Sequence, residues 1–400
     1  MQSISVLRIF WVFLKLGCTS FGGPAAHLVF FHQCFVKNKQ WLSDTEYAQI
    51  MALAQLLPGP TSSQAGIGIG YLKKGYAGAA AAWLGFTLPS ALLMGAAAIA
   101  GQHYFKLIST QSFHIIQLLV FAVVIHAFWQ MFKSFCGSFW HKMIMLSATA
   151  LILLLPSSSS QICAILAAGT AGLIYAKHQS NTAVAKPAAD SASAMNRMQK
   201  LRASFWLLLF FLPFALFLFL HQTEHSVWRS IYDFYQSASL VFGGGHVVLP
   251  LMYEDFVATQ KISAEAFHAG YALAQLMPGP LFSFASYLGA LLPLTPWPAL
   301  NAMMAVAAIF LPSFFLMFAA LPCWNWLMQR KFIRTAVLSI NAAAVGLLLA
   351  MLIPMGSQTI LQIADAIILI ALVLLLRTSL PIWLILMGAF AVCSVLFRLF

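Results

Sequence analysis

The chain has 400 residues, of which 62% are hydrophobic and only 8% are charged, and its formal net charge is +12. Soluble domains carry about 25% charged residues, so this composition excludes a soluble globular protein and predicts an integral membrane protein. Apolar stretches of about 20 residues recur along nearly the whole length, which predicts an all-α polytopic protein. The basic excess fits loops on the cytoplasmic side or an anionic substrate; we expect membrane lipid, and not nucleic acid, as a partner.

The first predicted span covers residues 5–31 and is interrupted at Thr19-Ser20-Phe21-Gly22-Gly23-Pro24. A polar loop follows, and Ser43 with Glu46 three residues later is typical of a helix N-terminus. This next helix is expected to run to Leu57, to break at Pro58-Gly59-Pro60 and to resume at Thr61, because two prolines withdraw backbone donors and the glycine loosens the chain. Further spans are predicted over 76–101, 112–132, 142–156 and 160–176.

Residues 177–203 form the only long polar stretch, and its five basic residues predict a flexible cytoplasmic linker. It separates an N-terminal transmembrane repeat, residues 1–176, from residues 204–400, which hold an extra span and a C-terminal transmembrane repeat. The later spans are predicted over 204–221, 299–320, 334–353, 358–376 and 380–398.

The two halves share sequence. Ala52–Pro60 recurs as Ala272–Pro280 with eight of nine positions identical, so that Pro278-Gly279-Pro280 repeats the first break 220 residues later. An odd extra span inverts the second half, which predicts two inverted repeats and about 13 spans. Lys37 and Lys39 are exceptions, because this count places them outside. A re-entrant hairpin at one of the breaks would change the count.

The broken helices are the candidate binding site. Only nine acidic residues occur, with no metalloprotease motif, so we expect neither catalysis nor a cofactor nor a metal site, and a cation carrier lacks the usual carboxylates. A helix that restarts after Pro-Gly-Pro presents free N–H groups and about half a positive charge to an anion. The hydrogen-bonding side chains in its first turn are Thr61, Ser62, Ser63 and Gln64, with Ser283 in the second half. The alternative is a tight turn with Thr61 as a cap.

A second group of candidates surrounds the glycine runs Gly22-Gly23 and Gly243-Gly244-Gly245. These runs either allow close helix approach or open a second break whose backbone lines the path. His27 and His246 beside them contact substrate or a proton, or are ordinary buried histidines. Lys15 is a candidate path residue, although a lysine near a helix end can also extend to the interface.

Both halves carry distinctive motifs: Thr19–His27, Gln55–Gln64 and Gly85–Ser90 in the first, and Phe242–Leu251 and Gly270–Phe282 in the second. They resemble the chromate transporter family, as a long-chain member with two repeats, over essentially the whole chain. The resemblance implies an inner-membrane carrier that exports chromate, a tetrahedral dianion similar to sulfate, and so confers chromate resistance. One departure is Cys34 before Phe35-Val36, where the family commonly has an acid; the second half keeps Glu254-Asp255.

Three hypotheses follow. In the first, the chain exports chromate by alternating access around both Pro-Gly-Pro breaks, with the oxyanion bound by Thr61 to Gln64 and Ser283 and the path lined by Lys15 and the glycine runs. In the second, sulfate or another oxyanion is the true cargo and chromate an incidental one. In the third, the chain is a membrane scaffold or a lipid-modifying enzyme whose breaks are packing features. Its assembly is left open, with a homodimer as one option.

Overall fold

The computed structural model describes residues 4–104, 110–182, 195–219, 227–328, 330–378 and 380–399, and these are helices and short connections without a strand. The α-helices are α1 (Val6–Thr19), α2 (Gly23–Phe31), α3 (Asp44–Leu56), α4 (Thr61–Tyr104), α5 (Thr110–Phe135), α6 (Phe139–Leu154), α7 (Ser158–Thr182), α8 (Arg197–Phe219), α9 (Val227–Ser239), α10 (Val248–Tyr253), α11 (Ala264–Leu276), α12 (Phe284–Leu291), α13 (Pro298–Ala320), α14 (Trp324–Met328), α15 (Lys331–Thr359), α16 (Ile363–Leu375) and α17 (Ile382–Leu399). Two π-helices, η1 (His32–Asn38) and η4 (Glu254–Ala258), and three 3-10 helices, η3 (Gly245–Val247), η5 (Leu281–Ser283) and η6 (Leu321–Cys323), complete the described chain.

Six helices of the described residues are long and apolar enough to cross a membrane, which supports a multi-pass membrane protein. They are α4, α5, α7, α8, α13 and α15. Four shorter helices are also apolar over 10–17 residues. The count of 13 spans stays a prediction.

The first helices form a hairpin rather than one interrupted span. The ring centroid of Phe13 on α1 lies 5.6 Å from that of Phe31 on α2 and 4.9 Å from that of Phe35 on η1. At 1.5 Å per residue, a straight helix from Phe13 to Phe31 would separate these rings by about 27 Å. The chain therefore turns back at residues 20–22, where Gly22 has a φ of +96°, and the prediction of a single span over 5–31 is wrong.

The segment around Pro58-Gly59-Pro60 is a second hairpin. α3 ends at Leu56 and α4 begins at Thr61, and the Cβ position of Gly68 lies 3.0 Å from Ile50 Cγ2. The chain then reverses once more inside α4, at Lys74 and Gly75, whose backbone is not helical. A Cβ at Gly70 would overlap the Gly78 carbonyl oxygen, so the two parts of α4 pack antiparallel through glycines.

The second half repeats both hairpins. The rings of Phe234 on α9 and Phe256 on η4 lie 4.5 Å apart, and those of Phe267 on α11 and Phe284 on α12 lie 5.1 Å apart. We number the four in chain order: hairpin 1 (α1, α2 and η1), hairpin 2 (α3 and α4 up to Lys73), hairpin 3 (α9, η3, α10 and η4) and hairpin 4 (α11, η5 and α12). Their tips are residues 20–22, 57–60, 240–244 and 277–280.

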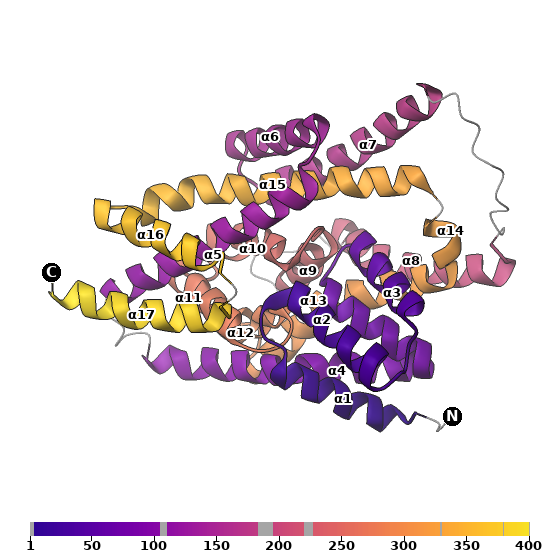
Figure 1. The fold of residues 1–400 in the computed structure, drawn as a ribbon, viewed down its shortest axis with the longest axis horizontal. Coiled ribbons are helices and arrows are strands. Elements are labelled where there is room, and N and C mark those ends of the chain that lie inside the picture. The colour runs from indigo at the N-terminus through magenta and orange to yellow at the C-terminus, as the bar shows by residue number, and fades with distance from the viewer. Residues whose placement is uncertain are drawn as a thin grey trace.

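The longer helices frame these hairpins. In Figure 1 the short helices α9, α10, α11 and α12 lie between the long helices α4 and α15. α15 packs against α5, α6 and α7, and α13 packs against α4, α8, α9 and α12. Helix α7 extends to Thr182 and α8 begins at Arg197, so both ends of the predicted flexible linker are helical, while residues 183–194 lie outside the described chain.

Candidate functional site

The tips of the hairpins are joined by two equivalent backbone hydrogen bonds. The N–H of Gly59, at the tip of hairpin 2, donates to the carbonyl oxygen of Val241 in hairpin 3 over 2.7 Å. The N–H of Gly279, at the tip of hairpin 4, donates to the carbonyl oxygen of Ser20 in hairpin 1 over 2.9 Å. Each Pro-Gly-Pro tip is thus bound by the glycine-run tip of the other repeat.

Both tip glycines are required by their backbone and their surroundings. Gly59 has a φ of +124° and Gly279 one of +97°, which side-chain-bearing residues rarely adopt. A Cβ on Gly59 would lie 2.7 Å from Ser313 Oγ, and one on Gly279 would lie 2.9 Å from Ser90 Oγ. Ser90 and Ser313 end the repeated Leu-Pro-Ser sequences, so this contact is also exchanged between the repeats.

A cavity of about 270 Å³ with both polar and apolar walls, the tip cavity, lies beside these contacts. Its walls combine the tips of hairpins 1, 3 and 4 with one face of α5. The lining includes Gly22, Gly23, Gly243, Gly244, Gly245, His246, Gln275, Gly279, His126, Gln130 and Ser134. No Asp or Glu of the described residues lines it, so a bound anion would meet backbone and neutral side-chain groups without carboxylate repulsion.

The α5 wall is a polar stripe in an apolar helix. His126, Gln130 and Ser134 are four residues apart and therefore share one face. The Gln130 amide nitrogen donates to His126 Nε2 over 2.6 Å, which leaves the other ring nitrogen of His126 to carry the proton. Ser134 Oγ donates to the Gln130 carbonyl oxygen over 2.9 Å. These bonds fix the stripe while leaving the second N–H of the Gln130 side-chain amide as a donor.

A second hollow of about 530 Å³, the basic vestibule, shares His126, Gln130 and Ser134 with the tip cavity. Its other walls are Trp129, Lys133 and Arg377. The Lys133 ammonium lies 5.1 Å and the Arg377 guanidinium 5.3 Å from the centroid of the Trp129 ring, so both cations stack on one indole. Two positive charges thus stand at the approach to a cavity without acids.

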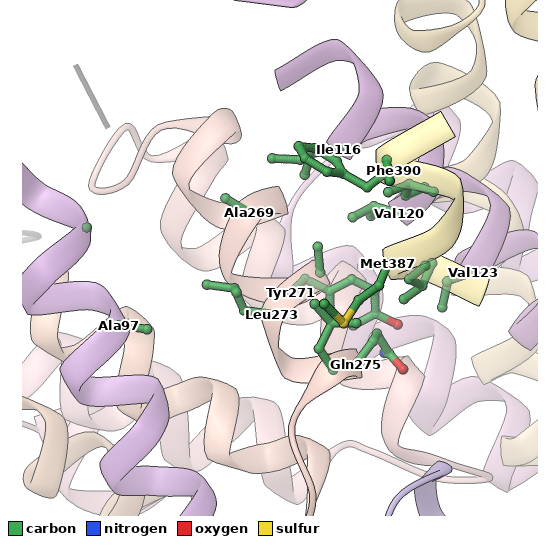
Figure 2. A pocket seen from close by; sticks show the side chains of 16 residues that line it. Ala97, Ile116, Val120, Val123, Ala269, Tyr271, Leu273, Gln275, Met387 and Phe390 are labelled. Atoms are coloured by element: carbon green, nitrogen blue, oxygen red, sulfur yellow. The ribbon is translucent and has the colours of Figure 1, made fainter. Parts of the chain in front are cut away.

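On its other side the tip cavity adjoins an apolar cavity of about 530 Å³. The two share Val123 and Gln275, and the Tyr271 hydroxyl is hydrogen-bonded to His246 Nδ1 over 2.7 Å. Figure 2 shows Tyr271, Gln275 and Met387 gathered at one end of this cavity, with apolar side chains of α5 and α17 above them. A dry apolar segment opposes passage of a charged solute, so Tyr271 and Gln275 mark the boundary between a polar and an apolar half.

The candidates predicted from sequence are separated by the fold. Gly22, Gly23, Gly244, His246 and Gly279 line the tip cavity. The remaining candidates line none of the cavities described above: Thr61, Ser62, Ser63, Gln64, Ser283, Lys15 and His27.

The structure shows where those remaining residues lie. Gln64 is fully buried and its side-chain nitrogen donates to the Pro58 carbonyl oxygen over 2.5 Å, so it braces the tip of hairpin 2. Ser63 is also buried, and its hydroxyl has no partner among the described residues. His27 is buried and its Nε2 donates to the Ser20 carbonyl oxygen over 3.1 Å. Ser283 is buried in the core, whereas Lys15 lies on the exposed face of α1. Their role as ligands stays a prediction.

Sequence reasoning missed the α5 stripe and the two vestibule cations. The signal was present, because polar residues spaced by four stand out in an apolar helix. The predicted site was based on the repeated breaks, and α5 lies outside the clearly repeated sequence, so the stripe was not predicted.

Comparisons with known proteins identify relatives over nearly the whole chain. A family model described as Chromate transporter matches residues 7–173 and 228–393, once in each half of the chain. The chain is 27% identical to a protein of Synechococcus elongatus named probable chromate transport protein, covering 89% of this chain and 86% of the relative. It is 26% identical to the chromate transport protein of Cupriavidus metallidurans, covering 91% and 86%, and 24% identical to that of Pseudomonas aeruginosa, covering 89% and 82%. No solved structure matches.

Proposed function

The chain belongs to the chromate transporter family, and we propose that it exports chromate from the cytoplasm across the cytoplasmic membrane, so conferring chromate resistance. The observation that carries this proposal is the tip cavity, which is bounded by both glycine-run tips and approached past Lys133 and Arg377 without a described acid on the way. The relatives named as chromate transport proteins supply the substrate class.

The chemistry of the cavity suits a tetrahedral dianion. Glycines at the tips let a ligand approach backbone N–H groups closely, and the side-chain amides of Gln130 and Gln275 can each donate an N–H to an oxyanion. The vestibule cations raise the local concentration of anions by electrostatic attraction. Alternating access follows if the polar and apolar halves open in turn at Tyr271 and Gln275.

We further propose that the four hairpins enter the membrane from one side and return without crossing it. The crossing segments are then the part of α4 after Gly75 and α5, α6, α7, α8, α13, α15, α16 and α17. With the N-terminus inside, the loops holding Lys37 with Lys39, Lys73 with Lys74, Lys133 with Lys142, and Arg330 with Lys331 all face the cytoplasm, as positively charged loops do. The second repeat is inverted, because four crossings of the first repeat and one by α8 place it on the other side.

Reconstitution tests the function. Purified protein in liposomes should carry radiolabelled chromate. Gln130→Ala should raise the KM at least about fivefold, equivalent to about 1 kcal/mol for a lost hydrogen bond. Ser147→Ala, an exposed position on α6, is the matched control and should transport as the wild type does. Absence of chromate flux with a folded wild-type protein would overturn the proposal.

A carrier for sulfate with chromate as incidental cargo is the second candidate, because both are tetrahedral dianions and a cavity of about 270 Å³ exceeds either. Competition between the two anions over a concentration series separates the candidates, since the true cargo has the lower KM. A scaffold or an enzyme would give flux of neither anion.

A further inference from the structure

A buried charge network lies in hairpin 3, away from the tip cavity. The Asp233 carboxylate, whose side chain is 1% exposed, accepts a hydrogen bond from Arg229 Nε over 2.9 Å and another from Lys261 Nζ over 2.8 Å. Arg229 also lies over the Phe217 ring, and Lys261 over the Phe256 ring. Both cations of the network are therefore committed to Asp233.

Asp255 belongs to the same network and has no cation in contact. It is 3% exposed, and none of the ion pairs among the described residues includes it. Its carboxylate oxygens accept instead from two hydroxyls, Ser158 Oγ over 2.6 Å and Ser237 Oγ over 3.1 Å. A buried carboxylate with only neutral partners costs free energy in its charged form and readily takes up a proton.

The groups around Asp255 reinforce that tendency. Burial and then the negative charge of Asp233 raise the pKa of Asp255 to about 7, against the two hydroxyls and Arg229, which lower it. Three further titratable groups lie near Asp255. They are Tyr232 on α9, Lys261 after η4 and Glu254, which precedes Asp255 in the chain. From α7 the facing group is the Ser158 hydroxyl, and η4 belongs to none of the six candidate spans.

Asp255 connects the two arms of hairpin 3 with the start of α7. Ser237 and Asp255 lie on the two arms of hairpin 3, whose residues Gly243 to His246, at the tip and in η3, form a wall of the tip cavity. Ser158 is the first residue of α7, which packs against α6 and α15. A charged carboxylate holds both hydroxyls more strongly than a neutral one does, so protonation loosens the contact between hairpin 3 and α7.

A cavity with polar groups in its wall lies near Asp255. It has a volume of about 330 Å³ and is lined by Glu254, Gln161 and His268 among others. Gln161 Oε1 and both ring nitrogens of the buried His268 have no partner among the described residues, so ordered water would be held there. Gln161 is one helical turn from Ser158, and Glu254 adjoins Asp255.

We propose that Asp255 is the proton-binding site of this carrier, and that its proton occupancy controls how hairpin 3 docks on α7 and thereby couples proton movement to transport of the anion. The coupling to transport rests on the proposed function, whereas proton binding rests on the buried contacts of Asp255 alone. The first repeat has no counterpart, because Cys34 takes the position of Asp255 when Phe35 is matched to Phe256. One proton site per chain is therefore expected.

Infrared difference titration of the purified protein tests the proton site without transport. The carbonyl band of a protonated carboxyl should appear as the pH falls through about 7 and should be missing in Asp255→Asn. Ser158→Ala removes a donor to the carboxylate and should move the titration to higher pH. Ser157→Ala, whose hydroxyl pairs with Ser160 and not with Asp255, is the control. A band that persists in Asp255→Asn overturns the assignment.

Transport in liposomes tests the coupling. Wild-type chromate flux should change as the pH passes through about 7, and it should be accompanied by proton movement that an internal pH dye detects. Asp255→Asn should lose both the pH dependence of the flux and the proton movement. Glu265→Gln, an exposed acid on α11, should keep them. If the wild type carries no chromate, the proposed function fails; if Asp255→Asn transports with an unchanged pH profile, only the coupling fails. Should Asp255→Asn not fold, an unchanged pH profile in Ser158→Ala has the same meaning.

Discussion

The backbone N–H of Gly59 donates to the carbonyl oxygen of Val241, and its repeat equivalent joins Gly279 to Ser20. Each repeat therefore supplies the acceptor for the tip of the other. This exchange gives a reason for the near-identical nonapeptides: both Pro-Gly-Pro tips must present one N–H in the same geometry to the partner repeat. A buried backbone donor left unpaired would cost about 1–3 kcal/mol, so the two repeats stabilise each other at the tips.

Substitution of the tip glycines should destabilise the protein. Gly59→Ala and Gly279→Ala each combine a positive φ with a Cβ that meets a serine hydroxyl, and each should cost at least about 2 kcal/mol. Thermal unfolding in detergent measures this as a lower midpoint. Gly388→Ala is the matched control, because no atom lies within 4 Å of its Cβ position and the residue is inside α17. Midpoints equal to the wild type for both tip variants would contradict the geometry.

The sequence allowed the breaks and the repeat to be predicted, but not the direction of the chain after each break. Pro-Gly-Pro at 58–60 ends α3 and starts α4 near the expected residues, since proline acts locally. Whether the chain then continues or doubles back depends on contacts such as Phe13 with Phe31 or Ile50 with Gly68. A continuing span and a re-entrant hairpin have the same apolar sequence pattern, so only tertiary packing distinguishes them.

The hairpins predict a topology that labelling can decide. Single cysteines in a background without the six native ones should react at Lys37→Cys from the cytoplasmic side only, together with Lys74→Cys as a reference. Ala258→Cys, exposed on η4, should react only from outside. A topology of 13 crossing spans instead places the loop of Lys37 outside and the loop of Ala258 inside. Labelling of Lys37→Cys from outside and of Ala258→Cys from the cytoplasm would therefore support 13 spans.

The candidate site, too, could be predicted only where its residues lie close together in the sequence. The glycine runs and His246 could be predicted as path residues because they interrupt helices within the repeat, and they line the tip cavity. Thr61 to Gln64 were predicted as ligands because a helix N-terminus attracts anions, yet the Gln64 side chain donates its hydrogen bond to the Pro58 carbonyl oxygen. The opposite wall comes from α5, more than 50 residues further along the chain, and a sequence without known contacts gives no means of pairing it with the tips.

The vestibule cations should affect capture of the anion more than its conversion. Lys133→Gln and Arg377→Gln each remove a positive charge from the approach to the tip cavity, and each should raise the KM for chromate about fivefold with kcat little changed. About 1 kcal/mol is the scale for one unit charge at contact distance in water, and added salt should shrink the effect. Lys74→Gln, exposed at the turn inside α4, is the control. A fall in kcat at constant KM would instead assign the cations to the transport step.

The two hairpin helices after the polar loops differ in their caps, and pH should separate them. Ser43 Oγ accepts from the Glu46 N–H over 3.2 Å, and the Glu46 carboxylate accepts from the Ser43 N–H over 2.8 Å. Ser263 Oγ accepts from the Ala266 N–H over 3.2 Å, with no carboxylate to return the bond. Ser43→Ala and Ser263→Ala should each cost about 1 kcal/mol near neutral pH.

The sign of the pH effect follows from Glu46. Hydrogen bonds from the Ser43 N–H and then from its hydroxyl hold the pKa of Glu46 below its ordinary value of 4.5. The stability from this pair is therefore present above that value and is lost as the pH falls through the lowered pKa. The difference in unfolding midpoint between wild type and Ser43→Ala should shrink on acidification, while that for Ser263→Ala should stay constant. A Ser43→Ala difference that does not vary with pH would show that the bond between the Ser43 hydroxyl and the Glu46 carboxylate contributes nothing to the cap.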